Sequence, residues 1–185
     1  MNNSKITLDE QILKENYILP QLKNQIEENF NCDGFYEIKQ DKYGNTYYIL
    51  GIYNGLELLL DAFTLKSNIF GKISPQKIGF LQAHEEDRST LGLGPGLALY
   101  VSSLYTTGTK NIGIGSSLLN SALDYARENM QHLNLATLTT LDESLGFYEK
   151  MGFLPASSTI DDDCTLMFKD IKSKTKQPQP EELEK

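Results

Sequence analysis

The spacing of apolar residues in the amino-terminal part of the chain changes from a helical to a strand-like pattern. Residues 9–30 carry apolar side chains at roughly helical spacing, the pattern of an amphipathic helix. Pro20 interrupts this segment, so we predict two short helices or one broken helix. Residues 46–65 are rich in tyrosine, isoleucine and leucine around the pair Asn54-Gly55, a frequent hairpin turn. We therefore expect two strands joined at this pair.

The central part of the chain alternates between strand-like and helix-like segments. The nearly all-apolar run at 97–106 predicts a strand, and residues 113–130 then place apolar side chains on one face of a helix. Another apolar run at 135–141 predicts the next strand. A strand–helix–strand unit of this kind is a right-handed crossover, so the two strands are expected to run parallel.

The remaining segments are turns, loops and shorter elements. Residues 41–45 indicate a turn, and 68–76 and 85–96 are predicted as loops. Asp142 is able to cap a short helix that Gly152 is placed to end. The shorter predicted elements are a strand at 77–84, the helix at 142–151 and closing strands at 153–159 and 164–171.

These elements predict one α/β (α+β) domain built on a single mixed sheet. The sheet is expected to have about seven strands, mostly antiparallel, and to be flanked by helices. The domain is predicted to span residues 1–171, with a helical amino-terminal part at 1–33. Residues 172–185 contain almost no apolar side chains and include two prolines, so a disordered tail is expected there.

The composition narrows the classes of partner and of cellular compartment. A formal net charge of −8 opposes binding to a phosphate backbone, so no nucleic-acid partner is expected. The sequence has neither a run of about 18 apolar residues nor a signal-peptide core, which predicts no membrane span and a cytoplasmic location. Cys32 and Cys164 lack metal or redox spacing, so both are predicted as small buried apolar residues, and no metal site is expected.

Two glycines stand where the strand at 97–106 gives way to the helix at 113–130. Gly113 and Gly115 indicate either a tight turn that needs a positive φ, or a phosphate cradle of bare backbone at a helix start. The spacing alone favours neither interpretation. The dinucleotide fingerprint needs a third glycine where Leu118 stands, and no Gly-Lys-Ser/Thr of a P-loop follows, so both rival motifs are disfavoured.

A second motif, LGFYEKMGF at 145–153, lies about 30 residues downstream of the glycines. Together with Lys110, Gly113 and Gly115 it resembles the GNAT superfamily of acyl-CoA-dependent N-acyltransferases. The signature of that family is Arg/Gln-x-x-Gly-x-Gly/Ala at the start of a helix, followed by a strand and a helix with Phe-Tyr-Glu-Lys-x-Gly-Phe. Lys110 stands where the family carries Arg or Gln, and the resemblance is clear over about residues 77–170.

The resemblance implies where a co-substrate binds. In the family the fourth and fifth strands are parallel and splay apart, and acetyl-CoA lies in the gap. Its pantetheine arm pairs with the fourth strand, and its pyrophosphate contacts the N–H groups of the following turn and helix. The implied coenzyme-binding residues are Leu104, Tyr105, Thr107, Lys110, Asn111, Ile112, Gly113, Ile114, Gly115 and Ser116.

The resemblance also implies acetyl transfer to a primary amine by direct attack on the thioester. Tyr148 is then the catalytic acid that protonates the leaving thiolate. Because an alkylamine is largely charged at pH 7, a general base is needed as well. The sequence leaves the identity of that base open. The candidates are Glu57, Asp61, Glu85, Glu86, Ser102, Ser103, His84 and His132.

Two functions stay open at this point. One is an active acetyltransferase. The other is a GNAT-like module that binds acyl-CoA or a protein partner without catalysis, and it is kept because Lys110 replaces the usual Arg or Gln. The partner of the enzyme would be a small-molecule or peptide amine, and the protein a monomer or homodimer. The glutamate-rich end at 181–185 resembles secretion signals of some bacterial effectors, which is an alternative to the cytoplasmic location.

Overall fold

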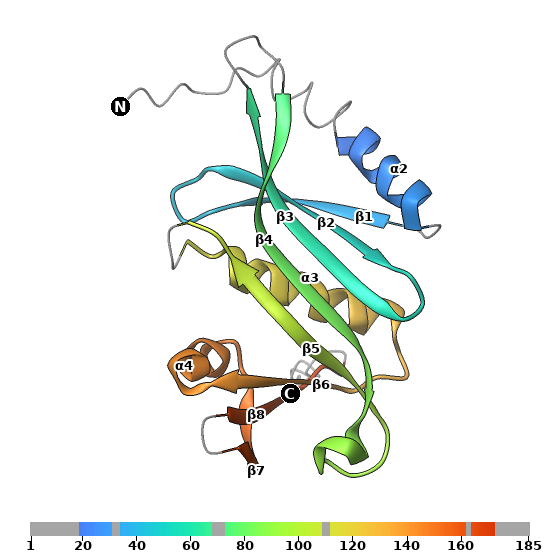
Figure 1. Ribbon diagram of the computed structural model, residues 1–185, viewed down its shortest axis with the longest axis vertical. Helices are drawn as coiled ribbons and strands as arrows, with labels where there is room; N and C mark the ends of the chain where they lie inside the picture. Colours follow the sequence, from blue (N-terminus) through green and yellow to red (C-terminus); the bar gives the residue numbers. More distant parts are fainter. Residues whose placement is uncertain (1–18, 31–33, 68–72, 109–111, 162–163, 173–185) are drawn as a thin grey trace, which may run out of the picture.

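One mixed sheet organises the part of the chain that the structure describes. The computed structural model describes residues 19–30, 34–67, 73–108, 112–161 and 164–172 (Figure 1). Eight strands within these residues are ordered β1-β2-β3-β4-β5-β6-β8-β7. Every pairing is antiparallel except the one between β5 and β6. The strands are β1 (Gly34–Gln40), β2 (Thr46–Tyr53), β3 (Glu57–Ser67), β4 (Ile73–Asp87), β5 (Leu97–Thr106), β6 (Leu135–Leu141), β7 (Leu154–Asp161) and β8 (Cys164–Asp170).

The helices lie on both faces of this sheet. Alternation along β2 shows this directly, because Tyr47 and Ile49 belong to the large core with α3, whereas Tyr48 and Leu50 pack with Leu19 of α2. Three side chains of α4 contact the large core, so α4 lies on the α3 face. The helices are α2 (Leu19–Phe30), the short 3₁₀ helix η2 (Arg88–Leu91), α3 (Ile114–Asn129) and α4 (Asp142–Lys150).

The long helix α3 supplies the central layer of the core. Leu118, Leu119 and Ala122 are completely buried against the sheet, as the helical spacing predicted. Burying one leucine side chain contributes about 1.5–3 kcal/mol, so this face of the helix is a main source of stability. Tyr47 also donates a hydrogen bond from its hydroxyl to Ser117 Oγ at 2.6 Å, which ties β2 to the first turns of α3.

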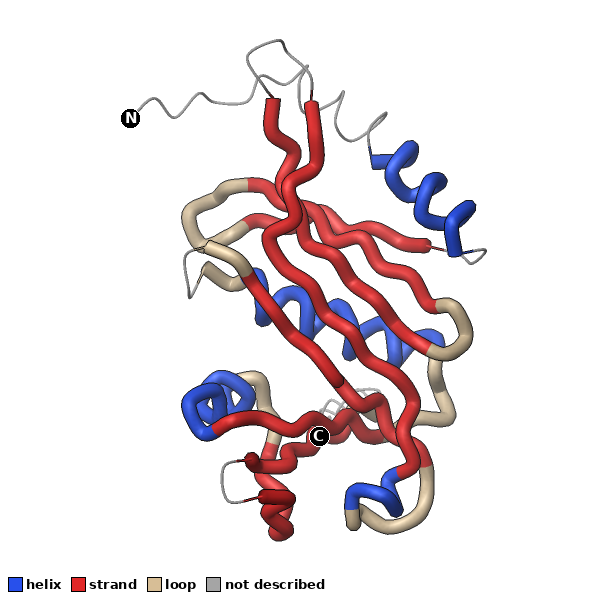
Figure 2. Tube along the Cα trace, in the orientation of Figure 1, coloured by secondary structure: helices blue, strands red, loops and turns tan. Residues whose placement is uncertain are grey.

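β5 and β6 are paired over only a short length. Their parallel register covers Leu99 to Val101 of β5 and ends there, and the two strands then diverge (Figures 1 and 2). The register between β4 and β5 also shifts at this point, because Ser103 pairs with Gln82 but Val101 pairs with Ala83. Ser102 is therefore the extra residue of a β-bulge, which bends a strand locally. The bulge coincides with the place where β5 leaves β6.

Most of the predicted elements are confirmed. The Asn54-Gly55 hairpin joins β2 and β3, with Gly55 at φ +87°, and the strands at 97–106 and 135–141 run parallel. Gly152 ends α4 with φ +83°, as predicted. The prediction that Asp142 caps α4 is wrong, because Leu141 is the N-cap and provides no side-chain hydrogen bond.

Three assignments also differ from the prediction. In the predicted loop at 85–96, the first residues extend β4 to Asp87 and the next four form η2. Residues 34–40 form the edge strand β1, which was not predicted because its apolar positions alternate with charged ones in a single short run. Residues 73–76 belong to β4 rather than to a loop, since Pro75 pairs opposite Leu65 in the far end of the β3–β4 hairpin. The predictions for residues 1–18, Cys32 and 173–185 lie outside the described residues.

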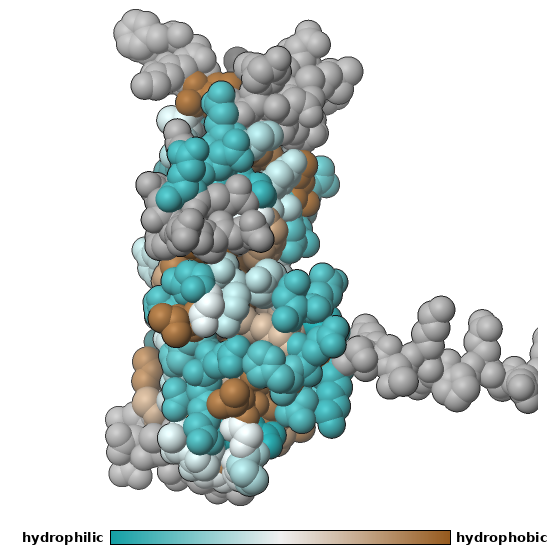
Figure 3. Space-filling view, turned by 90° about the vertical axis from the view of Figure 1, so that its right-hand side faces the viewer, coloured by the Kyte–Doolittle hydropathy of each residue, from teal (hydrophilic) through white to brown (hydrophobic). Residues whose placement is uncertain are grey.

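Figure 3 shows one narrow face that is largely hydrophilic, with apolar side chains in small separate patches. None of the described helices has the length and apolar character needed to cross a bilayer. The thiol of Cys164 at the start of β8 is free and half-buried.

Candidate functional site

Beyond the bulge, one edge of β5 is open. Thr107 donates its N–H to Ile78 O at 2.9 Å, which makes these two residues a hydrogen-bonded pair of the β4–β5 ladder. Peptide groups alternate in direction along a strand, so those of Tyr105 also face β4. The peptide groups of Leu104 and Thr106 then face the gap toward β6, where no described strand pairs with them. An extended ligand with amide groups is able to bind this edge as an additional strand.

The end of the open edge lies beside the amino end of α3, since a Cβ atom on Gly115 would be 3.7 Å from Cγ2 of Thr106. The first intrahelical hydrogen bond runs from Ser117 N to Gly113 O at 3.0 Å, so the N–H groups of Ile114, Gly115 and Ser116 have no partner within the helix. Gly113 is the N-cap at φ +97° and makes no side-chain cap bond. None of the described residues accepts from these three N–H groups, and they share the positive end of the helix dipole, which favours an anion at this position.

Gly113 and Gly115 serve different purposes at this turn. Gly113 needs its positive φ, which an L side chain rarely adopts, so the tight-turn interpretation holds for this residue. Gly115 has an ordinary helical backbone and lies between β5 and α4. A Cβ atom placed on it would be 3.6 Å from Cζ of Phe147 and 3.7 Å from Cγ2 of Thr106. The missing side chain at Gly115 thus keeps the space between these two residues clear.

Tyr148 lies on α4, on the same face of the sheet as the amino end of α3. Its ring makes edge-to-face contacts with Phe147, at 4.9 Å between centroids, and with the buried Phe153, at 6.1 Å. No described residue forms a hydrogen bond with its hydroxyl. Burial raises the pKa of the Tyr148 phenol above its usual value. The hydroxyl is therefore protonated at neutral pH and remains available as a donor.

The opposite face of the sheet carries a polar strip at the level of the bulge. Gln82 donates its Nε2 hydrogen to Glu57 Oε1 at 2.7 Å, between β4 and β3. Tyr100 of β5 donates its hydroxyl to Thr139 Oγ1 of β6 at 3.3 Å, just where the two strands separate. Side chains alternate between the two faces of a strand. Leu99, Val101 and Leu104 of β5 belong to the core with α3, so Tyr100 and Ser103 lie on the opposite face. We call Glu57, Gln82, Tyr100, Ser103 and Thr139 the polar strip.

The candidate bases differ in how their side chains are engaged. Glu85 lies on the α3 face, where it is 3.0 Å from His132 Nε2 and accepts a bond from Tyr53. Asp61 forms an ion pair with Lys77 at 2.6 Å. Both carboxylates are therefore already bound to other side chains, which makes them poorer candidates for the general base.

Three further candidates lie on or beside the polar strip. Glu86 accepts a bond from Thr90 at 2.9 Å and is 3.5 Å from His84 Nε2. Ser102 donates its hydroxyl to Gln82 O at 3.2 Å within the bulge. His84 contacts the ring of Tyr100 at 5.4 Å between centroids. Two candidates remain beside the bulge. Ser103 has no side-chain bond to a described residue, and Glu57 accepts its side-chain bond from Gln82.

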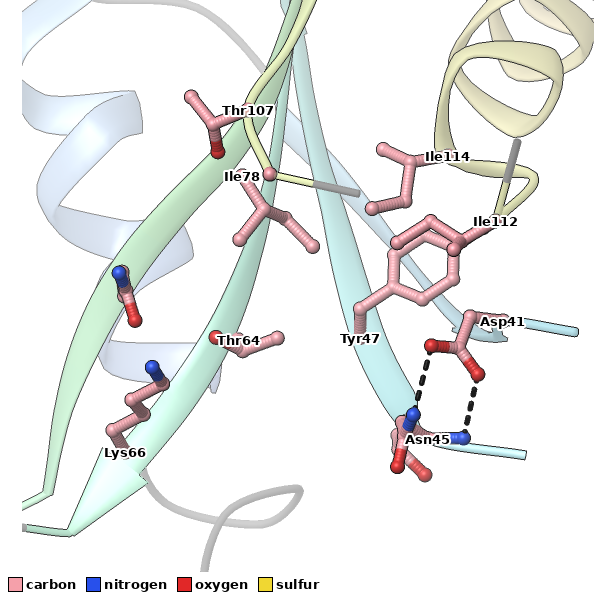
Figure 4. A pocket seen from close by; sticks show the side chains of 12 residues that line it. Asp41, Asn45, Tyr47, Thr64, Lys66, Ile78, Thr107, Ile112 and Ile114 are labelled. Atoms are coloured by element: carbon pink, nitrogen blue, oxygen red, sulfur yellow. Dashed lines mark hydrogen bonds between the residues drawn. The ribbon is translucent and has the colours of Figure 1, made fainter. Parts of the chain in front are cut away.

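A separate cavity of about 340 Å³ lies on the β4 side of β5, beside the amino end of α3 (Figure 4). Tyr47, Ile78 and Ile114 form its apolar wall. Asp41 borders it, with its carboxylate held by two hydrogen bonds from Asn45 at 2.9 Å each. Three of the coenzyme-binding residues implied by the sequence, Thr107, Ile112 and Ile114, line this cavity.

The structure brings most of the sequence-predicted site residues together. Leu104 lies on the open edge, Gly113 to Ser116 form the start of α3, and Tyr148 lies on the neighbouring helix. The peptide groups of Tyr105 and Thr107, which were also implied as coenzyme contacts, face β4 instead of the gap. Lys110 and Asn111 lie outside the described residues. Thr106 and Gln82 were not predictable as site residues, because strand parity and side-chain bonds between strands leave no signal in a single sequence. Within the described residues, no cluster of three or more His, Cys, Asp or Glu side chains is arranged to hold a metal ion.

Comparison with known proteins places these features in a family. Residues 32–153, more than half of the chain, match the model of the acetyltransferase (GNAT) family. The GNAT domain of PAT from S. lividans has a TM-score of 0.51 at 12% identity, covering 73% of this chain and 96% of that one. This likeness shows a shared fold. No curated protein sequence matches the chain.

Two further solved structures are similar at a lower level. NAA60 of Arabidopsis thaliana, in complex with a bisubstrate analogue, has a TM-score of 0.48 at 17% identity, covering 63% of this chain and 77% of that one. The PaiA N-acetyltransferase of Thermoplasma acidophilum, in complex with coenzyme A, has a TM-score of 0.44 at 17% identity. That match covers 87% of this chain and 76% of the other.

Proposed function

The chain belongs to the acetyltransferase (GNAT) family, and we propose that it transfers an acetyl group from acetyl-CoA to a primary amine. One observation carries the proposal. The open edge of β5 ends at Thr106, which lies beside Gly115 in the first turn of α3, where three N–H groups have no partner within the helix. An extended arm with amide groups fits the open strand edge, and a diphosphate at its end fits the N–H groups of the helix in charge.

The residues around the gap fit this co-substrate. The peptide groups of Leu104 and Thr106 would pair with the amides of the pantetheine arm. The N–H groups of Ile114, Gly115 and Ser116 would hold the diphosphate, because they carry the partial positive charge of the helix end. The absence of a side chain at Gly115 leaves the approach between Thr106 and Phe147 open. The co-substrate supplies a thioester, whose carbonyl carbon accepts the amine.

The proposed reaction is a direct attack. The lone pair of the neutral amine forms the new C–N bond, and the C–S bond breaks as the electrons move to sulfur. The amine loses a proton to a base, through water. The sulfur gains a proton from the hydroxyl of Tyr148, which solvent then reprotonates. Because the pKa of Tyr148 is raised, it keeps its proton at neutral pH and releases it only as negative charge develops on sulfur.

The test is the release of coenzyme A thiol by the full chain from acetyl-CoA, with and without amines. A primary alkylamine, a lysine-containing peptide and a peptide with a free amino terminus cover the main classes of amine. We expect thiol release that depends on one of them, together with an acetylated product in the mass spectrum. Calorimetric binding of acetyl-CoA without release by any amine would instead support the alternative, a GNAT-like module that binds acyl-CoA without catalysis. No binding would contradict both.

A further inference from the structure

We propose that Glu57 fixes the side-chain amide of Gln82 so that the Gln82 Oε1 atom receives an N–H group of the amine substrate. Glu57 is then a positioning residue, and Gln82 is the residue that touches the substrate. The inference rests on the proposed function, since it names the place where the amine binds in that reaction.

The position of the pair follows from the register of three strands. Gln82 lies directly opposite Ser103 of β5, the first residue beyond the bulge, and opposite Leu59 of β3. Glu57 lies diagonally across, two residues before Leu59 on the same face of β3. Gln82 therefore stands next to the point where β5 becomes free, and its side-chain nitrogen reaches the carboxylate of Glu57 on the neighbouring strand. Both residues are half-buried, so substrate is able to reach them.

The chemistry of the bond sets the direction of the amide. An ionised carboxylate only accepts hydrogen bonds, so the nitrogen of the Gln82 amide must face Glu57. The carbonyl oxygen is then turned away from Glu57, and no described residue donates to it. With its nitrogen held at 2.7 Å from Glu57 Oε1, the amide cannot rotate without losing that bond. The result is a fixed hydrogen-bond acceptor on the face of the sheet beside the bulge.

Neighbouring side chains offer acceptors of the same kind. The hydroxyl of Tyr100 gives its hydrogen to Thr139, so its oxygen is left as an acceptor. The hydroxyl of Ser103 is exposed on the same face. A group of oxygen acceptors beside a carboxylate suits a ligand that brings N–H donors and positive charge. The chemical class is therefore a primary ammonium, which gives a proton to water before the neutral amine attacks, and an anionic ligand would be repelled by Glu57.

The first experiment is kinetic and uses Glu57→Gln and Gln82→Met in the full chain. Glu57→Gln keeps the shape but allows the Gln82 amide to turn, and Gln82→Met removes the oxygen. We expect each variant to raise the KM for the amine about 10-fold or more, with kcat changed less than about threefold and the KM for acetyl-CoA unchanged. Glu128→Gln on the exposed side of α3 is the matched control, and it should behave as the wild type.

The double variant separates positioning from a merely structural role. If Glu57 acts through Gln82, combining the two substitutions should add almost nothing to the effect of Gln82→Met alone. Independent, additive effects on KM would overturn the proposal. A fall in kcat of about 100-fold in Glu57→Gln, with KM unchanged and the acidic limb of the pH profile lost, would also overturn it, because Glu57 would then be the base.

A second measurement needs no turnover, so it distinguishes failure of this inference from failure of the proposed function. The side-chain amide signals of Gln82 are followed by NMR while n-butylamine is added in the presence of coenzyme A. We expect n-butylamine to shift the signals of Gln82 and Ser103 in the wild type and in Glu128→Gln, but to have at least fivefold weaker affinity for Glu57→Gln. Equal responses of wild type and Glu57→Gln, or no response in the wild type, would contradict the proposal.

Discussion

Replacement of Gly115 by alanine should separate the affinity for acetyl-CoA from the stability of the fold. The added Cβ would lie 3.6 Å from Phe147 and 3.7 Å from Thr106, which are ordinary contact distances. The backbone at Gly115 is helical, so alanine fits there without strain, and alanine is the better helix former by up to about 1 kcal/mol. We therefore expect the melting temperature of Gly115→Ala to stay the same or to rise slightly.

The same methyl group should weaken binding of the co-substrate. It narrows the approach between Thr106 and Phe147, and it projects beside the N–H groups that would hold the diphosphate. Hydrogen bonds to a charged group contribute about 1.5–3 kcal/mol each. The loss of one such bond raises the dissociation constant by about 10- to 150-fold, since 1.4 kcal/mol corresponds to a factor of ten.

The assay is calorimetric titration of acetyl-CoA beside thermal melting, with Gly146→Ala as the matched control. Gly146 lies within α4, has no heavy atom within 4 Å of the added Cβ, and has an ordinary φ. Its replacement should raise stability in the same way but leave the affinity unchanged. An affinity of Gly115→Ala within about twofold of the wild type would refute the cradle at the start of α3. An equal loss in both variants would assign the effect to helix stability instead.

Three further outcomes follow from the site and the core. Tyr148→Phe should lower turnover by roughly 10²- to 10⁴-fold with little change in acetyl-CoA affinity, and turnover equal to the wild type would exclude Tyr148 as the acid. Truncation after Ile171, which is buried, should leave the melting temperature unchanged, whereas a drop of many degrees would show that the removed segment stabilises the domain. Burial raises the pKa of Tyr47, of Tyr53, where Glu85 adds to the effect, and of Tyr148. The unfolded chain therefore loses these protons first, so the tyrosines should lower the urea midpoint above about pH 10, and a midpoint that stays constant from about pH 9 to pH 11 would contradict the raised values.

The sequence was sufficient to predict the elements with strong periodicity or defined turns. The helix at 113–130, the strands around it and the Asn54-Gly55 hairpin all follow from local patterns that the tertiary structure does not override. The edge strand β1 was missed because it is short and reverses the usual pattern. Its exposed positions include Tyr36 and Ile38, whereas the charged Glu37 and Lys39 are half-buried. Pro75 concealed the first residues of β4, since proline is normally excluded from paired strands but is tolerated near the end of a hairpin.

The site was predictable only where a motif lies within one continuous segment. Gly113, Gly115 and Tyr148 belong to such motifs, so a single sequence contains the signal. The bond between Gln82 and Glu57 depends on the register of β3 and β4, and the exposure of Ser103 depends on the bulge at Ser102. A register shift changes every partner without changing any local pattern, which is why these features became visible only in the folded chain.

The most direct test of the account is residue-resolved amide hydrogen exchange, measured by NMR on the full chain with and without acetyl-CoA. The peptide groups of Leu104 and Thr106 face the open edge, whereas that of Tyr105 faces β4. We predict that acetyl-CoA slows exchange at Leu104, Thr106 and the amides of Gly115 and Ser116, and leaves Tyr105, already protected by β4, nearly unchanged. Unaltered exchange at Leu104, Thr106 and Gly115 under saturating acetyl-CoA would contradict the claim that β5 and α3 form the binding site.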